Sequence, residues 1–318
     1  MATYKEIHGV KVQYRGSDAT AIEGDVWYNS NQGVLKMYAA LGAWATGGNL
    51  NLARYEVTGT GTQTAALAAG GDTGSVSVKS EEYDGSSWTE SGDINTARDQ
   101  LAAGGIQTSA LIFGGQPPAS GLDVVESYNG STWTETTEIN TGRRALSGAG
   151  ASSTSALAFS GYTTANVDLT ESYNGSAWTE VGDLNTARRA AYGGGTATSA
   201  LMVGGHVDAD SALVESWNGT SWTEVGDLNA AGAGTGAGIT DSTSGIVFGG
   251  DRPGTGALTE SWDGSSWTEV ADMATARSYL GGAGTNTSGL AFGGNAPPAS
   301  NATEEWDVSA SIETIAFD

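Results

Sequence analysis

One tripeptide, Trp-Thr-Glu, occurs five times in this chain at intervals of 44 or 45 residues. A second landmark repeats in the same phase: a short apolar run that ends in a Gly-Gly pair, replaced once by Ser160-Gly161. Two landmarks with one period indicate a single supersecondary unit repeated about six times, which is typical of a propeller or a solenoid. The repeat-defining residues are Trp88, Trp133, Trp178, Trp222 and Trp267, and Gly71, Gly115, Gly161, Gly205, Gly250 and Gly294.

Glycine is unusually frequent, with 49 residues in 318, whereas proline occurs only 5 times. Because the glycines recur in phase with the aromatic residues, the composition indicates a packed repeat and not a disordered low-complexity chain. The length is sufficient for a large core, and a repeat array builds that core by stacking its units.

The chain is strongly acidic, with 36 Asp and Glu against 13 Lys and Arg and a net charge of -23. Such a chain lacks the basic patch that neutralises phosphates, so we expect no nucleic-acid binding. The acidity favours solubility, while the alternative of Ca²⁺ sites has one candidate, the Asp208-Ala-Asp210 segment. Without cysteine, disulfides and thiol chemistry are excluded.

No stretch of 18 apolar residues occurs, which predicts that no helix inserts into a membrane. The first residues lack the apolar core of a secretory signal. We therefore expect a protein that is made and folded in a cytoplasm.

One repeat, residues 184 to 228, predicts four short strands. Small residues between Arg188 and Gly194 suit a crowded inner strand. The second and third strands are expected at Ala200 to Val203 and at Ala212 to Trp217, and the fourth begins at Trp222. Between the last two, an Asn-Gly or Asp-Gly pair recurs in five units and predicts a type I′ hairpin turn.

The periodic Trp is interpreted as a packing residue that fills the gap between adjacent sheets. The aromatic residue before each turn forms a second packing layer. The alternative is a ring of aromatic side chains that stack on sugars. The second set comprises Tyr83, Tyr128, Tyr173, Trp217, Trp262 and Trp306.

Arginine also recurs, once in the strand before most Gly-Gly strands, and the fifth unit lacks it. We expect these arginines to pair with in-phase carboxylates, and a ring that binds an anion in the channel is the alternative. The arginines are Arg54, Arg98, Arg143, Arg188 and Arg277; the two candidate carboxylate sets are Asp93, Glu138, Asp183, Asp227 and Asp272, or Glu82, Glu126, Glu171, Glu215 and Glu260.

The register of an apolar strand ending in Gly-Gly, then Tyr, then Trp resembles the kelch repeat, for example at Phe113-Gly114-Gly115, Tyr128 and Trp133. The resemblance covers about residues 49 to 318. The unit here is a little shorter than the usual kelch unit, and Ser160 departs from the pattern. The resemblance implies an all-β, six-bladed kelch-like β-propeller, with seven blades as the alternative.

Two segments are candidates for completing the last blade. Gly42 to Thr46 contains Trp44, which lies 44 residues before Trp88 and therefore in phase with the repeat. We expect this segment to be an extra outer strand that closes the ring by strand exchange, which removes open sheet edges. The apolar alternation from Ser311 to Phe317 is the other candidate for the missing Trp strand.

Residues 1–48 break the repeat and are expected to form a separate N-terminal segment, with the propeller at residues 49–318. A hairpin is predicted from Asp25 to Tyr38 with its turn ending at Gly33. It is similar to Gly-Asp-x-Trp-Tyr-Asn segments of bacteriophage tail and fibre-like virion proteins. The hairpin could instead simply supply closing strands of the propeller. Candidate attachment residues are Asp25, Trp27, Tyr28, Lys36 and Tyr38.

No catalytic set stands out, because the chain has only His8 and His206 and every unit offers the same acids. We therefore expect no enzyme, no cofactor and no metal site. The resemblances imply a non-enzymatic bacteriophage structural protein of the virion: a tail fibre, a tail accessory or a capsid-decorating knob, present in many copies. Its expected partners are other virion proteins through residues 1–48, with host surface polysaccharide as a further candidate.

Two alternatives remain open. One is a free, lectin-like glycan-binding propeller in which a loop aromatic residue such as Tyr162 contacts the sugar. The other is a glycoside hydrolase of the sialidase-like kind.

Overall fold

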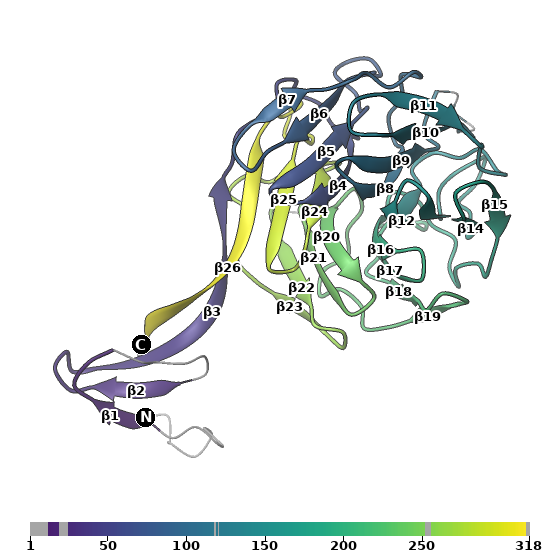
Figure 1. Ribbon diagram of the computed structural model, residues 1–318. Coiled ribbons are helices and arrows are strands. Elements are labelled where there is room, and N and C mark those ends of the chain that lie inside the picture. The colour runs from purple at the N-terminus through teal and green to yellow at the C-terminus, as the bar shows by residue number, and fades with distance from the viewer. Residues whose placement is uncertain (1–11, 19–24, 118, 120, 252–255, 316–318) are drawn as a thin grey trace. The chain divides into compact units, whose positions relative to one another are not determined.

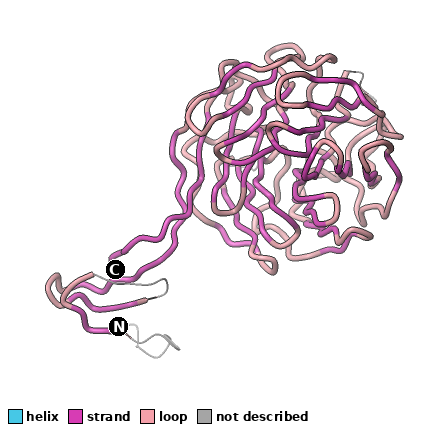
Figure 2. Tube along the Cα trace, viewed as in Figure 1, coloured by secondary structure: helices cyan, strands magenta, loops and turns pink. Residues whose placement is uncertain are grey.

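The computed structural model describes residues 12–18, 25–117, 119, 121–251 and 256–315. Every regular element in this part of the chain is a strand, as Figure 2 shows. None of the described residues belongs to a helix long and apolar enough to cross a membrane. The chain divides into two compact units: Trp44–Trp306, and Met1–Ala43 together with Asp307–Asp318. The last twelve residues therefore group with the N-terminal segment and not with the repeats.

The larger unit is a β-propeller (Figure 1). Its five blades are antiparallel sheets of four strands that follow one another along the chain. They are β4 (Thr58–Thr62), β5 (Ala65–Ala69), β6 (Ser80–Tyr83) and β7 (Trp88–Glu90); β8 (Ala102–Ile106), β9 (Ser109–Phe113), β10 (Val125–Tyr128) and β11 (Trp133–Thr136); β12 (Ser147–Ser152), β13 (Ser155–Phe159), β14 (Thr170–Tyr173) and β15 (Trp178–Glu180); β16 (Tyr192–Thr196), β17 (Ser199–Val203), β18 (Val214–Trp217) and β19 (Trp222–Glu224); and β20 (Gly236–Asp241), β21 (Ser244–Phe248), β22 (Thr259–Trp262) and β23 (Trp267–Glu269).

A composite sheet closes the ring between the fifth and the first of these blades. It contains β24 (Gly281–Gly284), β25 (Ser288–Phe292), β26 (Thr303–Ile315) and β3 (Val34–Thr46), in the order β24-β25-β26-β3. Within the propeller unit, β3 supplies Trp44–Thr46 as the outer strand. The Trp44 ring lies 5.0 Å from that of Phe248 and 5.5 Å from that of Trp306. The segment around Trp44 thus takes the place of the periodic Trp strand.

The prediction of six blades, with seven as the alternative, is wrong, because the propeller has five blades of consecutive strands. The remaining sheet, which closes the ring, takes strands from two distant parts of the sequence. The proposal that Ser311 to Phe317 replaces the Trp strand is also wrong, because β26 leaves the propeller unit after Trp306. Of that segment, Ala316 and Phe317 lie outside the described residues.

The turn between the third and fourth strands of each blade differs from the predicted type I′ hairpin. Tyr128 pairs with Trp133, so four residues and not two lie between the strands. Only Gly130 has a positive φ, of 91°. The side-chain oxygen of Asn129 accepts hydrogen bonds from the backbone N–H groups of Ser131 and Thr132, both at 3.0 Å. This local capping explains why Asn or Asp precedes the glycine.

The periodic Trp residues are buried between neighbouring blades. Trp133 is 6% exposed, and its Nε1 donates to the Ser80 hydroxyl of the preceding blade at 3.1 Å. Trp222 makes the same bond to Thr170 at 2.9 Å. Rings buried in this way pack blades together and present no stacking surface to a sugar.

Each recurrent arginine forms an ion pair with a glutamate on the third strand of its own blade. The pairs are buried, with N–O distances between 2.5 and 3.2 Å: Arg54–Glu81, Arg98–Glu126, Arg143–Glu171, Arg188–Glu215 and Arg277–Glu304. Burial lowers the pKa of Arg98 to about 10, against the opposing effect of Glu126. The recurrent arginines therefore do not pair with the carboxylate set that begins with Asp93.

Two details correct the predicted pairing. In the first blade Arg54 pairs with Glu81, and the predicted Glu82 instead accepts a hydrogen bond from the Tyr128 hydroxyl at 2.8 Å. In the fifth unit Gly232 occupies the arginine position. There Glu260 accepts hydrogen bonds from the backbone N–H groups of Asn229 and Ala230.

The smaller unit contains β1 (Gln13–Arg15), β2 (Val26–Asn29) and the first part of β3. β2 and β3 form the hairpin predicted from the sequence, with Val26 opposite Met37 and Gly33 at a φ of 72° in the turn. β1 pairs with β2 in parallel.

Candidate binding site

Three positions on one face of the propeller carry chemically different residues from one repeat to the next. Because equivalent blades carry different residues at these positions, blade packing does not determine them. These positions are therefore candidates for ligand contacts. The positions are the residue after the recurrent arginine (Tyr55, Asp99, Arg144, Arg189, Ala233, Ser278), the next residue (Glu56, Gln100, Ala145, Ala190, Gly234, Tyr279), and the residue after the Gly pair (Asp72, Gln116, Tyr162, His206, Asp251, Asn295).

The second of these sets forms a ring around the channel. All six residues have a positive φ, between 50° and 60°. Five backbone hydrogen bonds of 2.6 to 2.9 Å join neighbours around the ring, for example from Ala190 N–H to the carbonyl of Ala145. A left-handed conformation costs a non-glycine residue about 1 kcal/mol, and these bonds offset that cost. The ring thereby fixes the side chains that surround the channel mouth.

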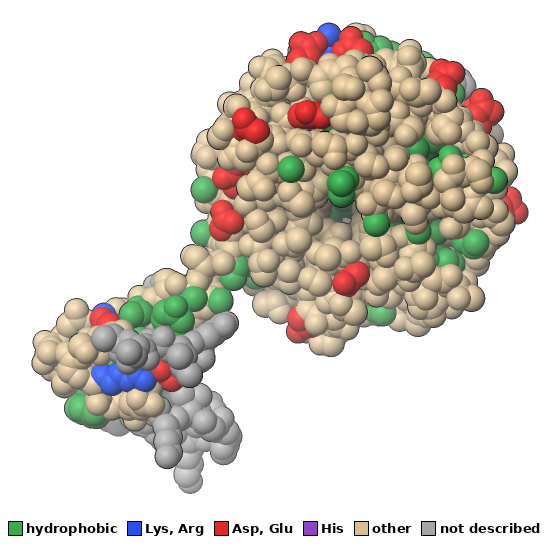
Figure 3. All heavy atoms as spheres, viewed as in Figure 1, with side chains coloured by type: hydrophobic (Ala, Val, Ile, Leu, Met, Phe, Trp, Pro, Cys, Tyr) green, Lys and Arg blue, Asp and Glu red, His purple; other side chains and the backbone are tan. Residues whose placement is uncertain are grey.

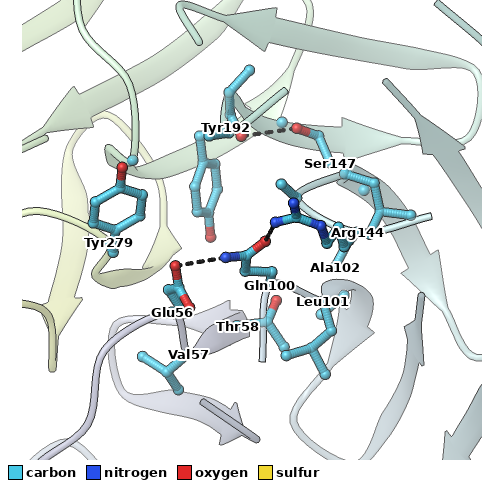
Figure 4. Close-up of a pocket in the computed structure, with 18 of the residues that line it drawn as sticks. Glu56, Val57, Thr58, Gln100, Leu101, Ala102, Arg144, Ser147, Tyr192 and Tyr279 are labelled. Atoms are coloured by element: carbon cyan, nitrogen blue, oxygen red, sulfur yellow. Dashed lines mark hydrogen bonds between the residues drawn. The ribbon is translucent and has the colours of Figure 1, made fainter. Parts of the chain in front are cut away.

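A cavity of about 190 Å³ lies at this mouth (Figure 4). Its walls include Glu56, Gln100, Tyr279 and the two arginines of the first set, Arg144 and Arg189. A second, smaller cavity of about 90 Å³ continues along the channel and is lined mainly by inner-strand glycines.

Tyr192 lines both cavities. Its hydroxyl donates to the carbonyl of Gly282 on β24 at 2.9 Å. Burial raises the pKa of this hydroxyl well above its usual range. The equivalent residues in the other units are small, which leaves room for one large ring: Thr58, Ala102, Ser147, Gly236 and Gly281.

One side of the mouth is acidic. The Glu56 and Asp99 carboxyl groups interact, and Asp99 is 2% exposed. Burial, more than any other cause, raises the pKa of Glu56 to about 7, and it raises the pKa of Asp99 as well. Because two close carboxylates do not both ionise easily, this pair holds a proton at mildly acidic pH.

Gln100 joins the acidic side to the basic side. Its Nε2 donates to Glu56 Oε1 at 2.8 Å, and its Oε1 accepts from Arg144 Nη1 at 2.9 Å, as the dashed lines in Figure 4 show. Since each end of the amide has a fixed partner, the Gln100 side chain is held in one orientation.

The basic side consists of Arg144 and Arg189, which each contact the ring of Tyr162. Their guanidinium carbons are 4.9 and 5.0 Å from the ring centroid. Asn166 accepts a hydrogen bond from Arg189 Nη1 at 2.7 Å, and the carbonyl of Ala119 accepts from Arg144 Nε at 2.9 Å. Over the stretches that the structure describes, neither arginine forms an ion pair with a carboxylate.

The sequence offered the Asp208-Ala-Asp210 segment as a candidate calcium site. Asp210 lies 3.3 Å from Nδ1 of His206, so its carboxylate already contacts a ring nitrogen within the same loop. Within the described ranges, no group of three or more His, Asp or Glu side chains is arranged to hold a metal ion.

Most of the predicted attachment residues lie inside the smaller unit. Trp27 is fully buried and donates from Nε1 to Asp18 at 3.2 Å, and Lys36 pairs with the same carboxylate at 2.5 Å. Asp25 pairs with Arg15 at 2.8 Å and its carbonyl accepts from the Tyr38 N–H. These contacts stabilise the hairpin.

Tyr28 is the predicted attachment residue that reaches the surface with an aromatic partner. Its ring lies 4.9 Å from that of Tyr14, which is 79% exposed. The sequence interpretation missed Tyr14, Arg15 and Asp18, because they precede the hairpin and carry no repeat signal.

No protein-family model matches the chain, and no curated protein matches it. Among solved structures, the chain is similar to the one described as "Structure of YjhT", with a TM-score of 0.66 and 14% sequence identity. The match covers 84% of this chain and 100% of that chain. At this identity the likeness shows the β-propeller fold alone.

Sequence reasoning did not single out Glu56, Gln100, Arg144 or Arg189. A signal for them was present, because they depart from the repeat at the two positions that follow the recurrent arginine. Finding them requires aligning the units with one another and reading the differences instead of the similarities.

Proposed function

We propose that this chain is a non-enzymatic structural protein of a bacteriophage virion, in which the smaller unit attaches to the particle and the propeller is displayed. The observation that carries the proposal is the two-unit architecture. The hairpin that is similar to phage fibre segments belongs to its own compact unit, and β26 returns to that unit after the last repeat. Attachment and display then reside in separate parts of one chain.

Surface chemistry supports this division. On the propeller face seen in Figure 3, Asp and Glu side chains are scattered and Lys and Arg are scarce, which suits a soluble, displayed body. The smaller unit exposes Tyr14, whose ring contacts Tyr28. Exposed tyrosines are typical anchors of protein interfaces.

The test is quantitative mass spectrometry of purified phage particles from the host or source. A constant ratio to the major capsid protein is expected, with many copies for a capsid knob and few for a tail part. Absence from intact particles would contradict the proposal.

A variant pair tests which unit attaches. The double substitution Tyr14→Ser and Tyr28→Ser is expected to lower incorporation into particles by at least tenfold. Ile106→Ser, which changes an exposed propeller residue, serves as the matched control and is expected to leave incorporation unchanged. Equal incorporation of both variants would show that this tyrosine pair is not needed for attachment.

A second candidate function, glycan binding by the propeller, is favoured by the cavity at the channel mouth. That cavity combines aromatic and hydrogen-bonding side chains at the positions where the repeats differ. Concave sites of this composition are the usual places for small polar ligands. The two functions are compatible, since a displayed propeller can bind host polysaccharide.

A further inference from the structure

We propose that Arg144 and Arg189 form an anion-binding subsite at the channel mouth, which takes the carboxylate or sulfate group of a single sugar ring. The inference deepens the glycan-binding candidate and rests on it. It does not depend on whether the chain belongs to a particle.

Arg144 and Arg189 differ from the other described cations of this acidic chain in their charge pairing. The five recurrent arginines are each neutralised by a glutamate, and Arg15, Lys36 and Lys79 also pair with carboxylates. Arg144 and Arg189 have no such partner in the described chain, although acidic residues outnumber basic ones by 36 to 13. Arg144 attracts the Asp99 carboxylate from beyond ion-pairing distance, and a bound anion supplies the direct counter-charge that each guanidinium group lacks among the described residues.

Contacts within the protein hold both guanidinium groups in place. The guanidinium carbon of each arginine lies 4.9 or 5.0 Å from the centroid of the Tyr162 ring, so each cation is attracted to that ring. Asn166 spans two blades: its Oδ1 accepts from Arg189, and its Nδ2 donates to the carbonyls of His206 and Val207. An anion therefore meets donors that are already ordered, so little side-chain entropy is lost on binding.

Both arginines have donor groups without a hydrogen-bond partner among the described residues. Arg144 uses Nε and Nη1 within the protein, and Arg189 uses Nη1. Neither Nη2 has a hydrogen-bond partner among the described residues, and neither is a buried unsatisfied atom. The planar fork of arginine matches the geometry of carboxylate and sulfate oxygens.

The volume and the lining of the cavity suit a single sugar ring. A cavity of about 150 Å³ accommodates benzene, so the cavity of about 190 Å³ accommodates one six-membered ring. Gln100 lies beside Arg144, and Glu56 lies next to Gln100, so both can bind hydroxyl groups adjacent to the anion (Figure 4). Tyr279, also in the cavity wall, offers a ring face to C–H groups. A sugar ring whose anionic group is flanked by hydroxyl groups fits this arrangement.

The test compares three sugars of equal ring size by isothermal titration calorimetry with the full-length chain: glucose, glucuronate and glucose 6-sulfate. Glucuronate or glucose 6-sulfate is expected to bind at least tenfold more tightly than glucose, and the stronger of the two identifies the source of the anion. Raising the salt concentration is expected to weaken the charged sugars selectively.

Substitutions locate the effect. Arg144→Gln and Arg189→Gln are each expected to lower the affinity for the charged sugar about tenfold, without changing that for glucose. Lys79→Gln removes one positive charge outside the cavity and is the matched control, with no expected change. Tyr162→Leu is expected to weaken binding of the charged sugar, whereas Tyr162→Phe retains the ring and the affinity.

Three results would overturn the inference: equal affinity for glucose and the charged sugars, no binding of any charged sugar, or the same loss in Lys79→Gln as in the arginine variants. In the second case the arginines serve only to join two blades, and their variants change stability alone. Failure here leaves the particle measurement untouched, so the two proposals fail separately.

Discussion

The hydroxyl of Tyr192 on β16 donates to the carbonyl of Gly282 on β24, two blades away around the channel, at 2.9 Å. The Tyr192 side chain lines both cavities of the channel. At its position the other units carry only small residues, which leaves room for this one ring.

Removing the Tyr192 ring is expected to destabilise the propeller more than removing its hydroxyl. Tyr192→Phe loses one hydrogen bond, for about 1 kcal/mol, whereas Tyr192→Ala also removes the packing of a partly buried ring, for about 2 kcal/mol. Urea unfolding followed by tryptophan fluorescence measures both. Equal losses in the two variants would show that the ring makes no packing contribution.

Breaking one buried ion pair is expected to have a large effect. Arg98→Met leaves the Glu126 carboxylate buried without its cation, which costs about 3–5 kcal/mol. Adding Glu126→Gln is expected to restore part of the loss. Lys79→Gln breaks an exposed pair with Glu90 and is expected to cost less than 1 kcal/mol. Urea midpoints compare the variants, and similar losses for the buried and exposed pairs would contradict this interpretation.

The stability of the protein is expected to fall as pH rises through the titration of Glu56. Its pKa is 4.5 in an unperturbed chain and about 7 in the folded protein, chiefly because of burial and then through Asp99 and Asp72. The folded state therefore binds the proton more tightly. Stability from this group is complete below about 4.5 and is lost as pH approaches and passes about 7.

Glu56→Gln is the variant that checks this dependence. It keeps the side-chain shape but cannot ionise, so it should flatten the decline in urea midpoint between pH 4.5 and 8. Glu135→Gln changes an exposed carboxylate and is the control. A wild-type urea midpoint that rises over this pH interval would contradict the prediction.

The closing strand gives a fourth prediction. Trp44→Ala removes a ring that contacts Phe248 and Trp306 and donates from Nε1 to Thr259. Because Trp44 is only partly buried, a loss of roughly 2 kcal/mol is expected, compared with about 3–5 kcal/mol for the buried Trp133→Ala. Unchanged stability of Trp44→Ala would mean that β3 does not complete the composite sheet in solution.

The repeat period predicted the blades because each unit carries the same packing residues in the same phase. Trp133 and Gly115 mark positions where blade packing and a positive φ permit few alternatives. The predicted turn was wrong because Asn-Gly suits both a two-residue hairpin and a longer loop capped by the Asn side chain. Only the pairing of Tyr128 with Trp133 distinguishes them.

The sequence analysis also selected the wrong glutamate as the partner of Arg54 in the first blade. Glu81 and Glu82 are adjacent, and successive residues of a strand point to opposite faces. Counting two residues back from Tyr83 selects Glu81, as Glu126 stands two residues before Tyr128. The Glu56–Asp99 contact was beyond sequence reasoning, because the two residues belong to different repeats and meet only through the packing of neighbouring blades.

The composite sheet also has a consequence for biosynthesis. Its outer strand, β3, emerges from the ribosome before any repeat, and its partner β26 emerges after all of them. The five regular blades can fold in order during translation, but the nascent chain must carry β3 unpaired until β26 has been made. A pause or truncation before Thr303 therefore leaves an open sheet edge, which exposes the growing protein to aggregation and to chaperones.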